Sequence, residues 1–200
     1  MKIGMIFECG PQGADKLVCE YLAGKILPGA ELVLRTLDNK PNLLKDAGLV
    51  AARLLADGCD RVLIVWDLRP AWPEKKERPC RRIERDALVK ALNEANVPQQ
   101  APVFLVCIEQ ELESWLIADE RKLANFLSTV AHPYTVNRIR NPDRHQQPKA
   151  FVINHFKTAR GWRYDDKVHA LKVVSNGDLD LKRLRCSESF SRFESKICGN

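Results

Sequence analysis

Residues 62–70, VLIVWDLRP, decide the fold class, because an uninterrupted apolar run stops there at a carboxylate, Asp67. A run that is apolar on both faces is typical of a strand buried inside a parallel sheet. Residues 2–7, KIGMIF, form a second run of this kind, which ends at Glu8. The sequence therefore raises the question of whether Glu8 and Asp67 meet in the folded chain.

Helix and strand patterns alternate around these two runs. We expect strands at residues 2–7, 31–36, 61–66 and 102–108, and helices between them at about residues 11–27, 43–56 and 83–95. This alternation predicts an α/β fold with a four-stranded parallel sheet and right-handed crossovers, flanked by helices. One helix, or two abutting helices, is expected after the fourth strand, up to about residue 127.

The last 70 residues have a different character. Residues 131–148 are rich in Pro, Asn and His and indicate an irregular excursion. Short helices are expected after it, at about residues 149–155, 166–174, 180–184 and 187–197. We therefore predict an α/β domain over residues 1–130 and a C-terminal helical extension over residues 131–200 that packs on it.

The composition is that of an ordinary globular chain, with 200 residues, 45% hydrophobic and 29% charged. No apolar run approaches the roughly 18 residues needed to span a bilayer, and the N-terminus shows no signal-peptide pattern, so we predict a cytoplasmic protein without a membrane partner. Seven cysteines with no C-x-x-C pair argue against a disulfide framework and a zinc site. A net charge of +6 modestly favours a nucleic-acid partner.

Acidic side chains at the strand ends are candidate metal ligands, because ligands of open parallel sheets bind at the carboxyl ends of the strands. Glu109 and Glu113 are four residues apart and would share one helix face, whereas Glu111 would point elsewhere. The resulting oxygen set of Glu8, Asp67, Glu109 and Glu113 suits Mg²⁺ or Mn²⁺, ions that serve phosphodiester chemistry. For Glu8 or Asp67 alone, a helix cap or an ordinary ion pair is an equal alternative.

Basic residues follow Asp67 closely. The candidates for nucleic-acid binding are Arg69, Lys75, Lys76, Arg78, Arg81 and Arg82, with Trp66 and Trp72 beside them. We hypothesise that they contact a phosphate backbone and that a tryptophan offers a stacking face. Because acidic residues are interleaved, a solvated loop that leads into a salt-bridged helix remains the alternative.

Five stretches together resemble the RloG-type, Toprim-like family of bacterial proteins of unknown function, which often lie beside ATPases in defence-related loci. These stretches are FECGPQGAD (7–15), VLIVWDLRP (62–70), EQELESWLIAD (109–119), PKA (148–150) and DLDLKRLRCSESFSRF (178–193). The resemblance implies a Toprim-like fold in which Glu8 is a general acid/base or metal ligand and Asp67 is the first acid of an Asp-x-Asp pair. Gly10, Gly13, Trp115 and Asp119 belong to its structural motifs, and for the last two a core anchor and a helix cap are the simpler interpretation.

By this resemblance the chain is expected to be a Mg²⁺- or Mn²⁺-dependent nuclease, or a nucleic-acid-processing subunit, of an anti-phage defence system with an ATPase partner. Glu8 and Asp67 would be its catalytic residues. Arg69 stands where the second aspartate is expected, and Cys9 separates Glu8 from Gly10.

These departures support an alternative, a non-catalytic effector subunit with a degenerate metal site that binds nucleic acid or a partner. A receiver-like phosphoacceptor domain is disfavoured, because it would need a pair of acids after the first strand. Whether the chain is an enzyme, whether DNA, RNA or tRNA is its substrate, and whether it forms a homo-oligomer are left open by the sequence.

Overall fold

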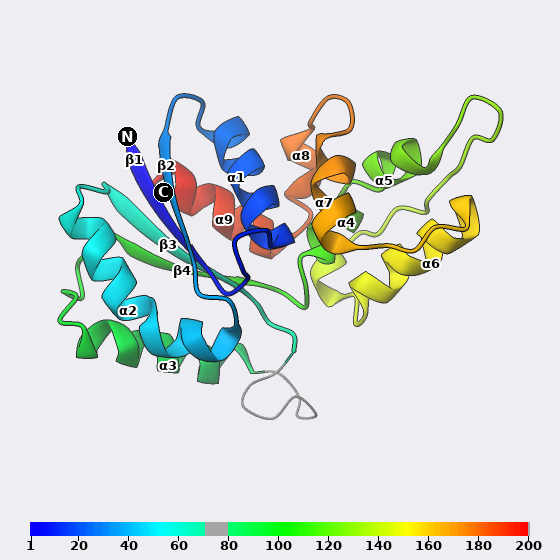
Figure 1. Cartoon of the computed structure of the whole chain (residues 1–200). Helices are drawn as coiled ribbons and strands as arrows, with labels where there is room; N and C mark the ends of the chain where they lie inside the picture. Colours follow the sequence, from blue (N-terminus) through cyan, green and yellow to red (C-terminus); the bar gives the residue numbers. More distant parts are fainter. Residues whose placement is uncertain (71–79, 200) are drawn as a thin grey trace.

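A four-stranded sheet is the centre of the computed structural model, which describes residues 1–70 and 80–199. The strands are β1 (Lys2–Phe7), β2 (Glu31–Thr36), β3 (Arg61–Asp67) and β4 (Val103–Ile108). All pairs are parallel, and the order across the sheet is β2-β1-β3-β4. The predicted α/β fold with a four-stranded parallel sheet flanked by helices is confirmed, and it is consistent with a Rossmann- or Toprim-like fold (Figure 1).

Helices connect the strands and continue after the last one. They are α1 (Ala14–Ile26), α2 (Lys40–Ala56), α3 (Arg81–Glu94), α4 (Glu113–Ala118), α5 (Glu120–Leu127), the 3₁₀ turn η1 (Pro142–Arg144), α6 (Pro148–Arg160), α7 (Asp166–Ser175), α8 (Leu181–Leu184) and α9 (Glu188–Cys198). In the described part of the chain, none of these helices is long and apolar enough to cross a membrane.

Alternate residues of the central strands point to opposite faces of the sheet, where they pack into two separate cores. Ile3, Met5 and Phe7 of β1 lie in a core with the helices α1, α7 and α9, whereas Ile6 packs with α2 on the other face. Both sets are fully buried. The continuous apolar runs in the sequence thus arise because each central strand is covered on both sides.

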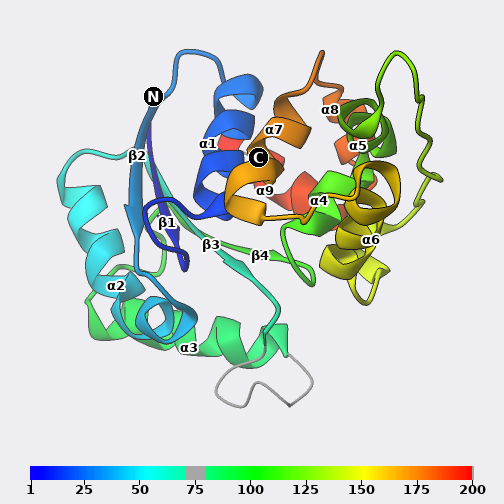
Figure 2. The same ribbon diagram turned by 45° about the vertical axis from the view of Figure 1, so that its right-hand side comes forward.

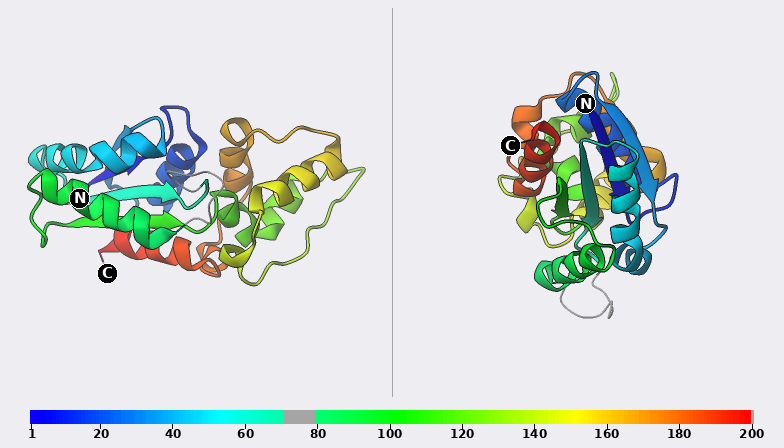
Figure 3. Two further views of the ribbon diagram at one scale, coloured as in Figure 1. Left: turned by 90° about the horizontal axis from the view of Figure 1, so that it is seen from below. Right: turned by 90° about the vertical axis from the view of Figure 1, so that its left-hand side faces the viewer.

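Different helices cover the two faces of the sheet. α2 and α3 pack together on one face, while α9 packs on β4 and α1 on the other face, although α9 lies at the end of the chain (Figure 3). Helices α4 to α8 gather beyond the carboxyl ends of the strands (Figures 1 and 2). The division of the chain into domains at residue 130 stays a prediction.

Local capping explains where several helices begin and end. Asn39 accepts a hydrogen bond from Asn42 N at 2.9 Å, so α2 begins at Lys40, three residues before the predicted start. Ser187 caps α9 in the same way through Phe190 N. Gly161 and Gly199 end α6 and α9 with positive φ angles of 66° and 89°, which glycine adopts without strain.

The contact between α2 and α3 is close enough to require a glycine. A Cβ atom on Gly48 would lie 2.0 Å from the carbonyl oxygen of Ala91, whereas nothing lies within 4 Å of the same position on Gly24 in α1. We expect Gly48→Ala to lower the free energy of unfolding by about 2 kcal/mol, because the two helices must separate. Gly24→Ala should raise it by about 0.5 kcal/mol through helix propensity. Urea denaturation of both variants checks this, and equal effects would contradict the packing argument.

Candidate functional site

The pairing of β1 with β3 brings Glu8 and Asp67 together. Phe7 pairs with Val65 in the parallel register, so both strands end at the same edge of the sheet. The Asp67 backbone N–H donates to Glu8 Oε1 at 3.3 Å across 59 residues of sequence. This edge is also the switch point, since β1 is followed in sequence by β2 on one side while β3 lies on the other. The two acids thus meet where open α/β sheets bind their ligands.

The turn after β4 closes this position from the other side. Leu112 N donates to Asp67 Oδ2 at 3.1 Å, and the turn bends at Gln110, whose φ is +67°. Helix α4 begins only at Glu113. The expectation that Glu109 and Glu113 share one helix face is therefore wrong, because Glu109 precedes the turn and the helix.

The structure also reverses the expected orientations of Glu109 and Glu111. Glu109 is bound by Arg81 and by Arg192, at 2.8 Å from the latter, and it does not line the cavity that Glu8 and Asp67 line. Glu111 lines that cavity and accepts a hydrogen bond from Lys149 N at 3.3 Å. Of the four predicted metal ligands, Glu8, Asp67 and Glu113 share one cavity.

This cavity has a volume of about 220 Å³ and lies between the strand ends and helices α4 to α8, which we call the helical lobe. Acids and cations dominate its lining, which includes Glu8, Asp15, Asp67, Glu111, Glu113, Asp166, Arg69, Lys149 and Lys167. Six carboxylates thus face three cations in a small space. We name this cavity the acid pocket.

Three carboxylate oxygens in the acid pocket are buried without a hydrogen bond. They are Glu8 Oε2, Asp67 Oδ1 and Glu113 Oε1, and the third of them has an ion-pair contact with Lys149, at 3.6 Å. A buried carboxylate oxygen that lacks a partner is costly, and a bound cation would satisfy it. Within residues 1–70 and 80–199, however, no three His, Cys, Asp or Glu side chains are already grouped as a metal site. The arrangement fits an ion held by one or two carboxylates with waters and a ligand's oxygens, as is usual for Mg²⁺.

Burial and mutual repulsion shift four carboxyl groups of the acid pocket toward their protonated forms. Burial raises the pKa of Glu8 to about 8, opposed by the charge of Lys40, and burial with the charge of Asp166 raises the pKa of Asp15 to about 6. Burial raises the pKa of Glu113 to about 7. For Asp67, burial and then the charges of Asp15, Glu8 and Glu113 raise the pKa well above its ordinary range. Such shifts are typical of functional sites.

Lys149, at the start of α6, is the main counter-charge of the acid pocket. Its Nζ lies 2.6 Å from Asp166 Oδ2 and 3.6 Å from Glu113 Oε1. Burial alone would lower the pKa of Lys149, but these carboxylates raise it above its ordinary value. Lys149 therefore stays cationic, and 39% of its side chain is exposed.

Lys40 supports the acid pocket from the opposite face of the sheet. Its buried ammonium donates to the carbonyl oxygens of Asp67, Leu68 and Pro70 at 2.6, 3.1 and 2.8 Å. It also pairs with Glu84 Oε1 at 3.1 Å, and Glu84 Oε2 accepts from Trp66 Nε1 at 2.8 Å. The chain that follows Asp67 is thus held by a buried charge from α2.

The predicted nucleic-acid-binding residues are dispersed. Arg69 lines the acid pocket and donates to Gln110 Oε1 at 2.7 Å. Arg81 binds Glu109, and Arg82 is exposed, 3.9 Å from Asp86. Lys75, Lys76 and Arg78, together with Trp72, lie outside the described residues.

The four residues predicted to belong to structural motifs are Gly10, Gly13, Trp115 and Asp119, and their contacts are those of a turn, a core and an ion pair. Gly10 O accepts from Gly13 N at 2.8 Å in the turn before α1, where a Cβ on Gly13 would lie 2.3 Å from Cys9. Trp115 is fully buried against Phe190 and donates to Ser189 Oγ at 2.9 Å, as expected of a core anchor. Asp119 makes no side-chain cap and instead pairs with Arg121 at 3.1 Å.

The sequence indicated no role for five further charged residues of the acid pocket: Asp15, Glu111, Lys149, Asp166 and Lys167. Asp15 and Lys149 lie within the stretches FECGPQGAD and PKA, but an acid or a lysine in a first helical turn looks like an ordinary helix-end residue. Only the docking of α6 and α7 beyond the sheet edge brings Lys149 and Asp166 to Glu8 and Asp67. The sequence carries no local signal for that docking.

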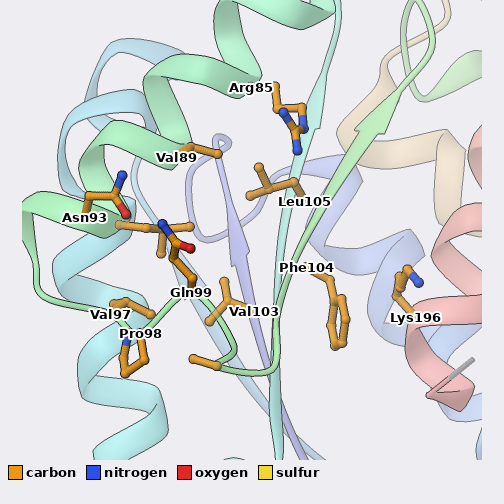
Figure 4. A pocket seen from close by; sticks show the side chains of 12 residues that line it. Arg85, Val89, Asn93, Val97, Pro98, Gln99, Val103, Phe104, Leu105 and Lys196 are labelled. Carbon is orange, nitrogen blue, oxygen red and sulfur yellow. The ribbon is translucent and has the colours of Figure 1, made fainter.

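A larger cavity of about 360 Å³ lies elsewhere, between α3, β4 and Lys196 of α9 (Figure 4). Among the residues that the structure describes, its charged lining residues are Arg85 and Lys196, and no carboxylate lines it. Buried carboxylate oxygens without hydrogen bonds single out the smaller acid pocket as the candidate site.

The raised pKa of Glu8 makes stability depend on pH. The folded protein holds a proton on Glu8 up to about pH 8, whereas the unfolded chain releases it near 4.5. The stability that this group contributes is therefore complete below about pH 4.5 and is lost as the pH rises through about 8. In EDTA, we expect Glu8→Gln to change the free energy of unfolding little at pH 5 and to raise it by about 2 kcal/mol at pH 8.5.

The matched control is Glu94→Gln, since Glu94 is an exposed acid of α3. Its unfolding free energy should follow that of the wild type at both pH values, as measured by urea titration. Parallel pH profiles of wild type and Glu8→Gln would contradict the raised pKa of Glu8.

Comparison with known families gives one match. The model of a family described as "Domain of unknown function (DUF4276)" matches residues 33–197. The matched region includes Asp67, Glu113 and Lys149, while Glu8 and Asp15 precede it. No curated protein and no solved structure matches the chain.

Proposed function

The chain belongs to the DUF4276 family, and within it we propose a Mg²⁺- or Mn²⁺-dependent phosphodiesterase or nuclease with a Toprim-like site. One observation carries this proposal. Glu8 and Asp67 meet at the switch point of the sheet, each with a buried oxygen that has no hydrogen-bond partner. Metal-dependent phosphodiester chemistry needs oxygen ligands of this kind in a small polar cavity.

In this proposal Glu8 and Asp67 hold the ion, and Glu113 is the third carboxylate within the same cavity. When bound, the ion would neutralise phosphate charge and activate a water molecule. The side chains of Lys149 and Arg69, which also line the acid pocket, would bind the phosphate oxygens. Glu109 has no part in it, because its carboxylate is taken by two arginines.

The resemblance to RloG-type proteins extends the proposal to a nucleic-acid substrate, an ATPase partner and a role in anti-phage defence. The substrate would be DNA, RNA or tRNA. One feature favours the alternative of a non-catalytic binding subunit. Arg69 lines the acid pocket at the position of the second aspartate, and a guanidinium there would bind an anion rather than a second metal ion.

Metal binding separates the two candidates. We expect calorimetry to detect one Mn²⁺ per chain, and Glu8→Gln/Asp67→Asn to weaken that binding by at least about tenfold. The affinity should fall from pH 8 to pH 6, because the carboxyl groups must lose protons to bind the ion. Cleavage of DNA, RNA and tRNA substrates with Mn²⁺ should be lost in the same variant.

The control is Asp86→Asn/Glu94→Gln, which removes the same charge from exposed acids of α3. It should bind Mn²⁺ and cleave like the wild type. Equal weak binding by the wild type and the Glu8/Asp67 variant would exclude the nuclease. Metal-independent binding of nucleic acid without cleavage would instead support the binding subunit.

A further inference from the structure

The net charge of the chain is concentrated in one segment. Between residues 131 and 172 there are nine lysines and arginines and three aspartates, which amounts to the net charge of +6 of the whole chain. The rest of the chain carries 23 charged residues of each sign. The excess positive charge therefore belongs to the helical lobe and not to the sheet.

The charges of this segment are also uncompensated. Lys149 pairs with Glu113 and Asp166, but none of the other eight cations forms an ion pair with a residue that the structure describes. Seven of these eight are exposed, and Arg160 is half-buried. Elsewhere in the lobe, by contrast, Arg121, Arg183 and Arg185 each pair with an acid. A group of exposed cations without counter-charges is the electrostatic signature of a polyanion-binding surface.

Helix α6 gives this surface a direction. Lys149, Ile153, Lys157 and Arg160 follow one another at spacings of three or four residues, so they share one side of the helix. Lys149 lines the acid pocket, and Arg160 lies about 16 Å further along the helix axis. A chain of phosphates on this side of α6 would therefore lead into the acid pocket.

A cation–π contact between Arg160 and Trp162 lies at the end of α6 that is far from the acid pocket. The guanidinium carbon of Arg160 lies 4.3 Å from the ring centroid of Trp162, which is 42% exposed. Phe126 holds the indole ring from the edge at 6.5 Å between centroids. Exposed indole rings and arginine guanidinium groups bind unpaired bases by stacking, and duplexes do not present such bases.

We propose that the α6 track, formed by Lys149, Lys157, Arg160 and Trp162, binds single-stranded nucleic acid and leads it into the acid pocket. The proposal deepens the proposed function by naming the substrate class, and it moves the nucleic-acid contact away from the stretch after Asp67. An amphipathic helix that binds a membrane would carry a broad exposed apolar face, whereas Ile153 is the one large apolar residue exposed on α6 among the described residues.

Binding is tested in EDTA, by fluorescence anisotropy with a labelled 20-nucleotide oligo(dT), an oligo(U) of the same length and a hairpin duplex. We expect the single strands to bind more tightly than the duplex. Lys157→Gln/Arg160→Gln should weaken single-strand binding roughly tenfold and reduce the slope of log K against log salt by about 1.4. Trp162→Ala should weaken it by about tenfold with an unchanged salt slope, and Trp162→Phe should restore it.

Two controls match these variants on the exposed side of α2. Lys45→Gln/Arg53→Gln removes the same charge as Lys157→Gln/Arg160→Gln. Leu49→Ala, like Trp162→Ala, removes a large apolar side chain, and that of Leu49 is 56% exposed. Both should bind like the wild type. Equal losses in the α2 and α6 variants, preference for the duplex, or equally tight binding to phosphatidylserine vesicles through the same residues would overturn the proposal.

The outcome is separable from that of the proposed metal site. Glu8→Gln/Asp67→Asn should bind the single strands in EDTA at least as tightly as the wild type, because it removes negative charge from the end of the track. If α6 binds single strands but no Mn²⁺ binds, only the metal-dependent activity fails. If Mn²⁺ binds at Glu8 and Asp67 while the α6 variants bind like the wild type, the track fails and the metal site stands.

Discussion

The parallel pairing of β1 with β3 is the interaction on which the candidate site depends. It places two acids that are 59 residues apart in the chain within one hydrogen bond of each other, from Asp67 N to Glu8 Oε1. The position lies between strands whose connections run in opposite directions, so no crossover helix covers it. Helix α4 and the turn before it then approach from β4 and add the bond from Leu112 N to Asp67 Oδ2.

Bringing carboxylates together in a partly buried cavity costs free energy, and the structure offsets this with cations from two layers. Lys40 reaches the site from α2 and binds the backbone after Asp67, while Lys149 reaches it from α6 and binds Glu113 and Asp166. The raised pKa values of Glu8, Asp67 and Glu113 show that this compensation is incomplete. A site with residual repulsion is one in which a bound cation has a large effect.

Charge is divided between the two parts of the molecule. The acid pocket lies where the carboxyl ends of the strands meet the helical lobe, and the lobe carries the excess of positive charge. The chain's modest total of +6 conceals this division, because acids and bases balance elsewhere. A local excess, rather than the total, decides which surface attracts a polyanion.

By itself, the sequence determined the strands, the parallel sheet and the placement of Glu8 and Asp67 at strand ends, because a strand covered on both faces must be apolar throughout. It also placed Trp115 correctly as a core anchor. Only the tertiary structure decided which other side chains join these acids. A turn at Gln110 turned Glu109 away and Glu111 inward, and the docking of α6 and α7 brought in Lys149 and Asp166. Such contacts depend on backbone angles at single residues and on packing between distant segments, which hydrophobic periodicity does not encode.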